Sequence, residues 1–389
     1  MKKNICVLTA TRAEYGLLKP VIEKLQQENS FDVSIVVTGM HLSPEFGLTY
    51  KEIEEDGLKI DKKIEILLSS DTPASISKSM GLAMISFADY FEELQPDGLI
   101  VLGDRYETLA VCCVAMNARI PIFHLYGGEA TEGIIDESIR HCITKMSYLH
   151  FTATEKYREK VIQLGESPDR VFNVGATGVE NILKRNLLFK KDLERSLNYS
   201  LTENYAIVTF HSVTLEDNSA EIQIQELLKA LDQFSNMQFI ITKANADADG
   251  RVINEYLEQY GQVHKNVIVV DSLGTQRYLS AVKYAKTVIG NSSSGIVEVP
   301  SFGVPTVNIG DRQKGRIQAD SVINCKPLSQ DIIKVINKAL SDDFINVAKQ
   351  AKNPYEGLNT SSQIVKHIKD FVINDKIDIK KKFYDLRTC

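Results

Sequence analysis

Carboxylates that follow two apolar segments are the residues of this chain most suited to chemistry. Asp104 comes directly after the apolar run Gly98–Leu102, and Glu129 follows the next run, Pro121–Leu125. Asp136 lies a few residues further on, where a helix is expected to begin. Crowded carboxyl groups raise one another's pKa, so that one can hold a proton while another acts as a base. The three acids therefore indicate general acid–base chemistry, although each alone could be a turn or N-cap residue.

A loop of small polar residues forms a second group that could bind a ligand. The run Gly290–Gly295, with the sequence GNSSSG, lies between the apolar segment Thr287–Ile289 and a predicted helix. Small residues let the backbone approach a ligand closely, hydroxyl groups donate hydrogen bonds, and a helix N-terminus carries about half a positive charge. The loop is therefore predicted to bind a diphosphate, although a serine-rich helix cap would produce the same pattern. The expected contacts are Ser292, Ser293, Ser294 and Gly295, with Glu298 accepting hydrogen bonds from a ribose.

Arg140 and His141 are expected beside the three acids, and Arg12, His211 and Arg312, which follow other apolar segments, complete the candidates found from the residues themselves. Arg12 precedes a helix expected to begin near Leu17, and it could bind an anion or cap its own loop by pairing with Glu14. His211 could act as an acid or donate to a leaving phosphate. Arg312 lies in a charged loop that is either solvated or folded over the anion.

The spacing of cysteines and histidines predicts neither a metal site nor a disulfide framework. Six cysteines are scattered without a CxxC motif, and no pair of histidines has ligand spacing. The segment after the first apolar run also lacks the GxGxxG motif and the P-loop lysine that nicotinamide and ATP sites use. We therefore expect no metal and no cofactor.

Short apolar runs that alternate with helical patterns must position these side chains. The alternation predicts an α/β fold with two Rossmann-like domains that face a cleft, because ligands of such sheets lie beyond the carboxyl ends of the strands. The expected strands are Ile5–Thr9, Val33–Thr38, Gly98–Leu102, Pro121–Leu125, Leu149–Thr152, Val171–Val174, Tyr205–Phe210, Gln238–Thr242, Asn266–Val270, Thr287–Ile289, Thr306–Ile309 and Ser321–Asn324.

The domain boundary is expected where this pattern is interrupted. Residues 177–202 hold a helical stretch, a basic region and a polar end, so we expect an N-terminal domain over 1–178 and a C-terminal domain over 179–360. A final helical stretch, Ser361–Asn374, follows a turn-rich segment. We expect the region of about 361–389 to pack back on the first domain.

The composition is that of an ordinary globular protein. A chain of 389 residues supports two domains, and 43% hydrophobic with 25% charged residues argues against disorder. A net charge of −6 argues against nucleic acid as a partner. No segment has the length of a signal-peptide core or a membrane span, so a cytoplasmic protein with no membrane partner is expected.

Seven segments, taken together, resemble one enzyme family. They are TRAEYG, VTGMHLS, LGDRYE, the region from GGE to IDESIRH, FHSVT, the region from GNSSSG to QKGR, and NPYEG. They resemble the hydrolysing UDP-N-acetylglucosamine 2-epimerases of bacterial sialic-acid synthesis and, more distantly, the epimerase half of the bifunctional vertebrate enzyme. The resemblance extends from about residue 4 to about residue 375.

This resemblance implies a fold of the glycosyltransferase-B type, no metal, no nicotinamide, and conversion of UDP-N-acetylglucosamine to N-acetylmannosamine and UDP. The implied reaction eliminates UDP to give 2-acetamidoglucal, to which water adds with the opposite configuration at C2. By analogy, a homo-oligomer, dimer or tetramer, is expected. The resemblance also implies proton transfer by Asp104 and Asp136, a leaving-group contact by His211, and UDP binding by Arg12, Ser292, Ser293 and Glu298, with support from Arg140, Asn245 and Arg312.

One position departs from the family pattern. Some relatives have a glutamate three positions before the Gly-Gly-Glu acid, where this chain has Tyr126. Either Glu129 takes over its task or two carboxylates suffice.

Three alternatives to this reaction stay open at the level of sequence. One is the same reaction on a UDP-2,4-diacetamido-2,4,6-trideoxy sugar for legionaminic acid. Another is a glycosyltransferase of the same fold, against which the group of carboxylates argues. The third is a sugar-nucleotide sensor without enzymatic activity.

Overall fold

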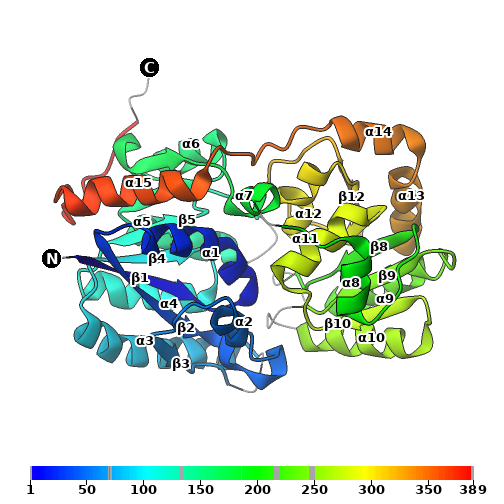
Figure 1. Cartoon of the computed structure of the whole chain (residues 1–389), viewed down its shortest axis with the longest axis horizontal. Helices are drawn as coiled ribbons and strands as arrows, with labels where there is room; N and C mark the ends of the chain where they lie inside the picture. The colour runs from blue at the N-terminus through cyan, green and yellow to red at the C-terminus, as the bar shows by residue number, and fades with distance from the viewer. Residues whose placement is uncertain are drawn as a thin grey trace. The chain divides into compact units, whose positions relative to one another are not determined.

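The computed structural model describes residues 2–68, 70, 72–131, 135–184, 186–213, 219–244 and 250–386 of the chain. The chain divides into two compact units (Figure 1). Unit 1 comprises Met1–Glu129, Asp136–Asn181 and Tyr355–Cys389, and unit 2 comprises Ala130–Ile135 and Ile182–Pro354. Each unit is built around its own parallel sheet.

A sheet of seven parallel strands forms the centre of unit 1 within the described residues. The strand order is β3-β2-β1-β4-β5-β6-β7, which is the Rossmann order with one strand added at the β7 edge. The strands are β1 (Lys3–Thr9), β2 (Phe31–Thr38), β3 (Lys62–Ile64), β4 (Gly98–Leu102), β5 (Ile122–Leu125), β6 (Leu149–Thr152) and β7 (Val171–Asn173).

Helices cover both faces of the unit 1 sheet, which explains why its central strands are apolar on both sides. On one face Leu18 of α1 and Ile364 of α15 share a core with Val7. On the other face Phe87 of α3 and Val111 of α4 belong to a second core. The helices are α1 (Arg12–Gln26), α2 (Tyr50–Glu55), α3 (Pro73–Leu94), α4 (Tyr106–Asn117), α5 (Asp136–Met146), α6 (Glu155–Gln163), α7 (Thr177–Lys184) and α15 (Thr360–Ile373), with 3₁₀ turns η1 (Gly39–Leu42), η2 (Pro44–Phe46) and η3 (Pro168–Arg170).

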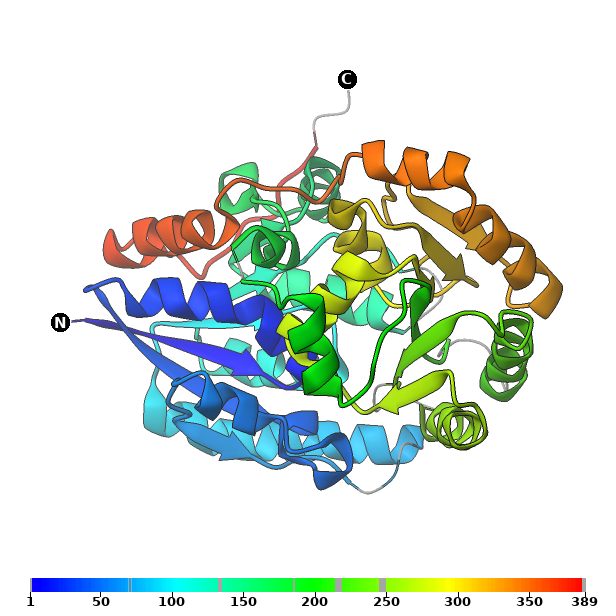
Figure 2. The ribbon, with the colours of Figure 1, turned by 45° about the vertical axis from the view of Figure 1, so that its right-hand side comes forward.

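Unit 2 repeats the same plan with six described strands in the order β10-β9-β8-β11-β12-β13. Helices α9, α10 and α13 pack on one face of this sheet, and α8, α11 and η4 pack on the other (Figure 2). The elements are α8 (Lys190–Leu197), β8 (Tyr205–Thr209), α9 (Ser219–Leu231), β9 (Gln238–Thr242), α10 (Gly250–Val263), β10 (Val267–Val270), α11 (Gly274–Tyr284), β11 (Thr287–Gly290), α12 (Ser294–Val297), η4 (Val299–Phe302), β12 (Thr306–Ile309), β13 (Val322–Cys325), α13 (Ser329–Ala339) and α14 (Asp342–Gln350).

The α/β class with two Rossmann-like sheets is confirmed, and every strand expected from the sequence is present within a few residues. Two expectations about helices are wrong. Helix α1 begins at Arg12 rather than near Leu17, because Thr11 caps it. The helix after GNSSSG is a single turn, because Pro300 cannot continue the α-helical hydrogen bonding. None of the helices in the described part of the chain combines the length and the apolar character needed to cross a membrane.

The segment that follows α15, here called the C-terminal strap (residues 376–386), is attached to unit 1 through Lys381. The Lys381 ammonium group donates hydrogen bonds to the carbonyl oxygen of Ser147 at 2.6 Å, to that of Lys145 at 2.8 Å and to Oε2 of Glu166 at 2.8 Å. The side chain of Glu166 is only 1% exposed. The strap therefore supplies a cation to a buried carboxylate.

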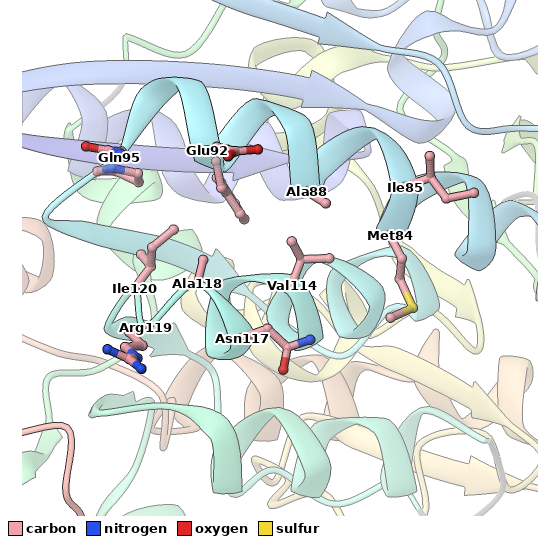
Figure 3. A pocket seen from close by; sticks show the side chains of 12 residues that line it. Met84, Ile85, Ala88, Glu92, Gln95, Val114, Asn117, Ala118, Arg119 and Ile120 are labelled. Atoms are coloured by element: carbon pink, nitrogen blue, oxygen red, sulfur yellow. The ribbon is translucent and has the colours of Figure 1, made fainter.

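A hollow of about 760 Å³ lies between α3 and α4 (Figure 3). Met84 and Ile85 are among its lining residues, as are Gln95 and Ile120. The last two residues precede β4 and β5, so this end of the hollow lies at the amino ends of the strands. Ligands of open α/β sheets bind at the opposite edge, beyond the carboxyl ends.

Candidate active site

The strand order of each sheet reverses at one point, and these points hold residues chosen from the sequence. In unit 1 the reversal falls between β1 and β4, where Arg12 follows β1 and Asp104 follows β4. In unit 2 it falls between β8 and β11, where His211 follows β8 and Ser292 follows β11. Such reversals open a crevice at the carboxyl ends of the strands, which is where open α/β sheets bind their ligands.

Arg140 lies at the centre of the carboxylate group in unit 1. Its side chain is fully buried, and a guanidinium keeps its charge in proteins. Nε and Nη2 both donate to Oδ2 of Asp104, with Nε at 2.9 Å. Nη1 donates to Oε2 of Glu137 at 2.6 Å and to the carbonyl oxygen of Glu129 at 2.8 Å. The planar guanidinium thus pairs with two carboxylates at once and fixes their orientation, and its single positive charge offsets one of their two negative charges.

The structure brings two of the three predicted acids directly to Arg140. Asp104, with a side chain 21% exposed, contacts it through the carboxylate, and the buried Glu129 contacts it through the backbone. Asp136 is half-buried and is the first residue of α5, as the sequence predicted. It therefore belongs to the first turn of the helix that carries Arg140.

Glu137 belongs to the same cluster but was not chosen from the sequence. Its Oε2 accepts a hydrogen bond from Arg140, and its Oε1 lies 3.1 Å from Nε2 of His141. Residues three and four positions apart share one face of a helix, so the spacing of Glu137, Arg140 and His141 contained this signal.

Tyr126, the residue that departs from the family pattern, contacts the start of α7. It has a positive φ of 69°, which is uncommon for a residue with a side chain. Its hydroxyl lies 3.0 Å from Oγ1 of Thr177 and accepts a hydrogen bond from the N–H of Gly178 at 3.3 Å. The aromatic residue thus satisfies a donor at a helix N-terminus.

The turn that holds Arg12 is stabilised by a buried acid. The Thr11 hydroxyl accepts a hydrogen bond from the N–H of Glu14, while Oε2 of Glu14 accepts from the N–H groups of Ala10 at 2.8 Å and Thr11 at 3.2 Å. This reciprocal pattern is a capping box. Burial, with Glu107 close by, raises the pKa of Glu14 to about 8. Arg12 is half-buried at the first position of α1, so the predicted loop position is replaced by a helix N-terminus.

Asn291 joins the two loops of unit 2 that were chosen separately from the sequence. Its Oδ1 accepts a hydrogen bond from the N–H of His211 and its Nδ2 donates to the carbonyl oxygen of His211, both at 2.8 Å. Its own carbonyl oxygen accepts from Arg312 at 3.2 Å and from Gln313 at 2.8 Å. The structure therefore brings His211, the run Gly290–Gly295 (the serine loop) and Arg312 together through Asn291, which lies in the predicted loop but was not among its expected ligand contacts.

The serine loop has less helix behind it than the sequence predicted. Ser292 and Ser294 are half-buried, Ser293 is exposed and Gly295 is buried. Because α12 is one turn long, its dipole is smaller than that of a full helix. Glu298, expected within that helix, lies at its C-terminal end, where burial raises its pKa.

Two sequence predictions remain, one for Asn245 and one for the absence of a metal site. Asn245, expected to support UDP binding, lies outside the described residues. Among the residues that are described, no group of three or more His, Cys, Asp or Glu side chains is arranged to hold a metal ion.

Comparison with known proteins identifies the family. Residues 23–369 match the family model described as UDP-N-acetylglucosamine 2-epimerase. The chain is 47% identical to a GDP/UDP-N,N'-diacetylbacillosamine 2-epimerase (hydrolyzing) of Campylobacter jejuni over 88% of this chain and 89% of the relative. It is 41% identical to polysialic acid biosynthesis protein P7 of Escherichia coli over 100% of this chain and 98% of the relative. The chain belongs to the UDP-N-acetylglucosamine 2-epimerase family.

A solved structure supports the fold. The UDP-GlcNAc 2-epimerase of Neisseria meningitidis bound to UDP-GlcNAc matches with a TM-score of 0.80 and 18% sequence identity, over 94% of this chain and 100% of that one. At this identity the likeness concerns the fold, which is of the glycosyltransferase-B type. The fold that the sequence resemblance implied is therefore confirmed.

Proposed function

We propose that the protein is a hydrolysing 2-epimerase of a UDP-linked 2-acetamido sugar. The observation that carries this proposal is the buried Arg140, which binds the carboxylates of Asp104 and Glu137 at the carboxyl edge of the unit 1 sheet. The chain that holds this cluster belongs to the UDP-N-acetylglucosamine 2-epimerase family. Such an arrangement can hold groups that remove and return a proton at one carbon.

The proposed reaction has two steps. In the first, the C2 proton is removed and the bond between C1 and the diphosphate oxygen breaks, which releases UDP and leaves 2-acetamidoglucal. In the second, the oxygen of water bonds to C1, and a proton adds to C2 on the face opposite to the one from which the first proton was removed. The sum is one sugar nucleotide and one water converted to UDP and a free 2-acetamido sugar epimeric at C2.

Unit 1 is proposed to supply the proton-transfer groups. Asp104 and Asp136 act as acid and base, with Glu129 as the third carboxylate, because Tyr126 occupies the alternative position. Arg140 fixes Oδ2 of Asp104 and so determines the direction of the other carboxylate oxygen. The fixed geometry reduces the reorganisation needed during proton transfer.

Unit 2 is proposed to bind the UDP. The serine loop faces the diphosphate, Glu298 accepts from the ribose, and His211 stabilises the charge that develops on the leaving phosphate. The contacts from Asn291 to His211 support this division of roles, because they fix the backbone of His211 relative to the serine loop. Arg12, Arg312 and Asn245 are proposed as further substrate contacts.

Two sugars satisfy this proposal. UDP-N-acetylglucosamine, giving N-acetylmannosamine for sialic-acid synthesis, is favoured by the family as a whole and by the similarity to polysialic acid biosynthesis protein P7. A UDP-2,4-diacetamido-2,4,6-trideoxy sugar is favoured by the 47% identity to the diacetylbacillosamine 2-epimerase. Location in the cytoplasm and assembly into a dimer or tetramer stay predictions.

The test is to incubate the protein with each sugar nucleotide separately in deuterated water and to follow the products by NMR. We expect UDP release without any added acceptor, and deuterium at C2 of the epimerised sugar. The sugar with the larger kcat/KM is the substrate. UDP release without deuterium at C2 would indicate simple hydrolysis or transferase activity and would overturn the epimerase mechanism. Binding without any turnover would indicate a sensor.

A further inference from the structure

His124 links the catalytic edge of the unit 1 sheet to its interior. It lies on β5, its side chain is completely buried, and its Nε2 is 2.8 Å from the carbonyl oxygen of Gly103. Gly103 has a positive φ of 78° and immediately precedes Asp104. The ring therefore contacts the backbone of the turn that presents the proposed acid.

The partners of His124 define one tautomer. A carbonyl oxygen can only accept a hydrogen bond, so Nε2 must carry the proton. The other ring nitrogen, Nδ1, is then an acceptor, and it lies 3.4 Å from the Thr144 hydroxyl, which can donate. Burial lowers the pKa of His124 to about 3, so the ring stays neutral at physiological pH.

His124 also contacts the turn that follows its own strand. A side-chain carbon placed on Gly127 would lie 3.1 Å from Nδ1 of His124 and 3.3 Å from Oγ1 of Thr144. Gly127 precedes the acid Glu129 by two residues. The ring thus fills the space between the turn after β4 and the turn after β5.

Asp104 is consequently fixed from two sides. Arg140 binds its carboxylate, and His124 binds the carbonyl group of the preceding peptide. The N–H of Gly103 donates to the carbonyl oxygen of Leu125 at 3.0 Å, whereas its carbonyl group is the side that His124 holds. Loss of the His124 contact would leave the peptide between Gly103 and Asp104 less restrained, because glycine at a positive φ imposes little restriction of its own.

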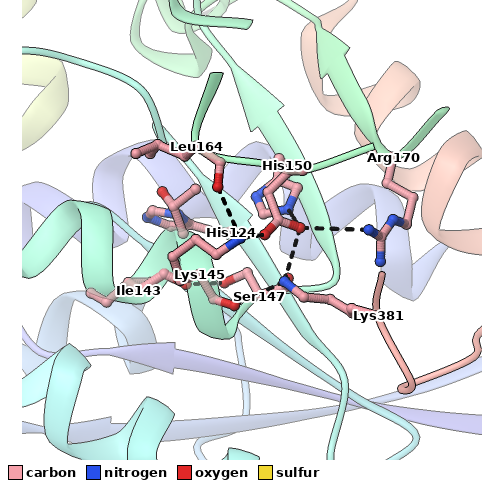
Figure 4. A network of polar contacts seen from close by, with 10 residues as sticks. His124, Ile143, Lys145, Ser147, His150, Leu164, Arg170 and Lys381 are labelled. Carbon is pink, nitrogen blue, oxygen red and sulfur yellow. Dashed lines mark hydrogen bonds and ion pairs between the residues drawn. The ribbon is translucent and has the colours of Figure 1, made fainter. Parts of the chain in front are cut away.

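His150 is a natural comparison for His124. It is paired with His124 in register on the adjacent strand β6, and it is also completely buried. Its Nε2 lies 3.3 Å from Oε2 of Glu166, which also contacts Lys145 and Lys381 (Figure 4). His150 therefore belongs to the network around the C-terminal strap, and among the described residues its ring makes no hydrogen bond to the Asp104 turn.

We propose that His124 is a positioning residue, whose neutral Nε2–H holds the Gly103–Asp104 turn in the geometry required for proton transfer. The proposal rests on the proposed function for its kinetic consequence, but the geometry of the turn can be tested without turnover.

The test compares matched variants. His124→Gln places an amide N–H near the position of Nε2, whereas His124→Asn reaches only the position of Nδ1. His124→Phe removes both nitrogens, and His150→Phe is the control for loss of a buried imidazole on the same sheet. Activity is measured on the sugar nucleotide that the wild-type protein turns over, together with the melting temperature of each variant.

We expect kcat to fall by roughly 10- to 100-fold in the Phe and Asn variants at position 124, the scale of one lost buried hydrogen bond. The KM should change by less than about threefold, because His124 contacts the Gly103–Asp104 turn and is not itself one of the proposed nucleotide contacts. The Gln variant should recover most of kcat, and His150→Phe should keep kcat while losing a similar amount of thermal stability. Equal kcat in His124→Phe and His150→Phe, or no difference between Gln and Asn, would overturn the proposal.

Two measurements test the geometry independently of activity. Nitrogen-15 NMR of labelled histidines should show one resonance pair, absent in His124→Gln, with Nε2 protonated and Nδ1 unprotonated. Hydrogen exchange of a peptide covering residues 103–109 should be faster in His124→Asn than in His150→Phe. A protonated Nδ1, or unchanged exchange, would refute the positioning role. If the wild-type protein turned over neither sugar, the proposed function would fail while these two results still decided the role of His124.

Discussion

Acidification should destabilise unit 1 strongly, because three of its histidines are buried in the neutral state. Burial lowers the pKa of His41 and of His124 from 6.5 to about 3, and that of His150 to about 4. In the unfolded chain each histidine binds a proton as the pH falls below 6.5, whereas in the folded chain it does not. The unfolded state therefore binds more protons, and the free energy of unfolding decreases as the pH falls through this window.

One buried acid opposes the trend. Burial, together with the nearby Glu107, raises the pKa of Glu14 from 4.5 to about 8, so the folded state binds this proton first as the pH falls. For these four groups, the difference between pH 6.5 and 4.5 is three protons on the unfolded chain against one on the folded chain. Each proton changes the free energy of unfolding by about 1.4 kcal/mol per pH unit, so the net loss is about 2.7 kcal/mol per pH unit. By about pH 5 the loss reaches about 4 kcal/mol, a large part of a typical protein's total stability.

The assay is urea unfolding followed by far-UV circular dichroism at several pH values from about 7.5 to about 5. His150→Phe removes one of the three buried histidines, so its slope should be shallower by about 1.4 kcal/mol per pH unit. A wild-type free energy of unfolding that changes by less than about 1 kcal/mol over this window would refute the reasoning. An unchanged slope in His150→Phe would refute the role of that histidine.

Three further predictions follow from other contacts. Gly290→Ala should prevent unit 2 from folding, measured as loss of soluble protein, because Gly290 has a φ of 133° and an added Cβ would overlap the carbonyl group of Thr209. Lys381→Met should lower the free energy of unfolding by about 2 kcal/mol in urea titrations, because it removes one of the cations around the buried Glu166. Arg140→Lys should lower the same quantity by about 3 kcal/mol and reduce turnover, since an ammonium group cannot reproduce the contacts of the planar guanidinium.

Each of these substitutions has a matched control. Gly57 also has a positive φ, 79°, but nothing lies within 4 Å of an added Cβ, so Gly57→Ala should fold. Lys59→Met removes a cation that is 85% exposed in its pair with Asp61, and Arg195→Lys changes a side chain that is 80% exposed. Both should change the free energy of unfolding by less than about 0.5 kcal/mol. An effect of the control as large as that of its partner would contradict the explanation given for that site.

The sequence predicted the strands well because buried parallel strands are continuous apolar runs bounded by turns. Strand β3 was missed because two of its three residues are exposed lysines, Lys62 and Lys63. The start of α1 could have been predicted from the spacing of Thr11 and Glu14, which is that of a capping box.

The site residues that directly follow strands could be predicted from the sequence, because the strand order determines where the strand ends lie. Asp104 and His211 follow strands at the two points of reversal, so topology alone places them. Glu137 could have been found from its spacing to Arg140 on one helix face, whereas Asn291 depended on a partner distant in the chain, which a single sequence does not resolve. The bonds between Asn291 and the backbone of His211 join residues 80 positions apart.

The return of the chain to unit 1 has a consequence for how the protein folds while the ribosome synthesises it. Ile364, Val365, Ile368 and Val372 of α15 lie in the same hydrophobic core as residues of β1 and α1. Unit 1 therefore contains both early and late residues of the chain, while most of unit 2 is one continuous stretch, Ile182–Pro354. During vectorial synthesis the second unit can complete its core first, and the first unit must wait with an apolar surface uncovered until α15 leaves the ribosome.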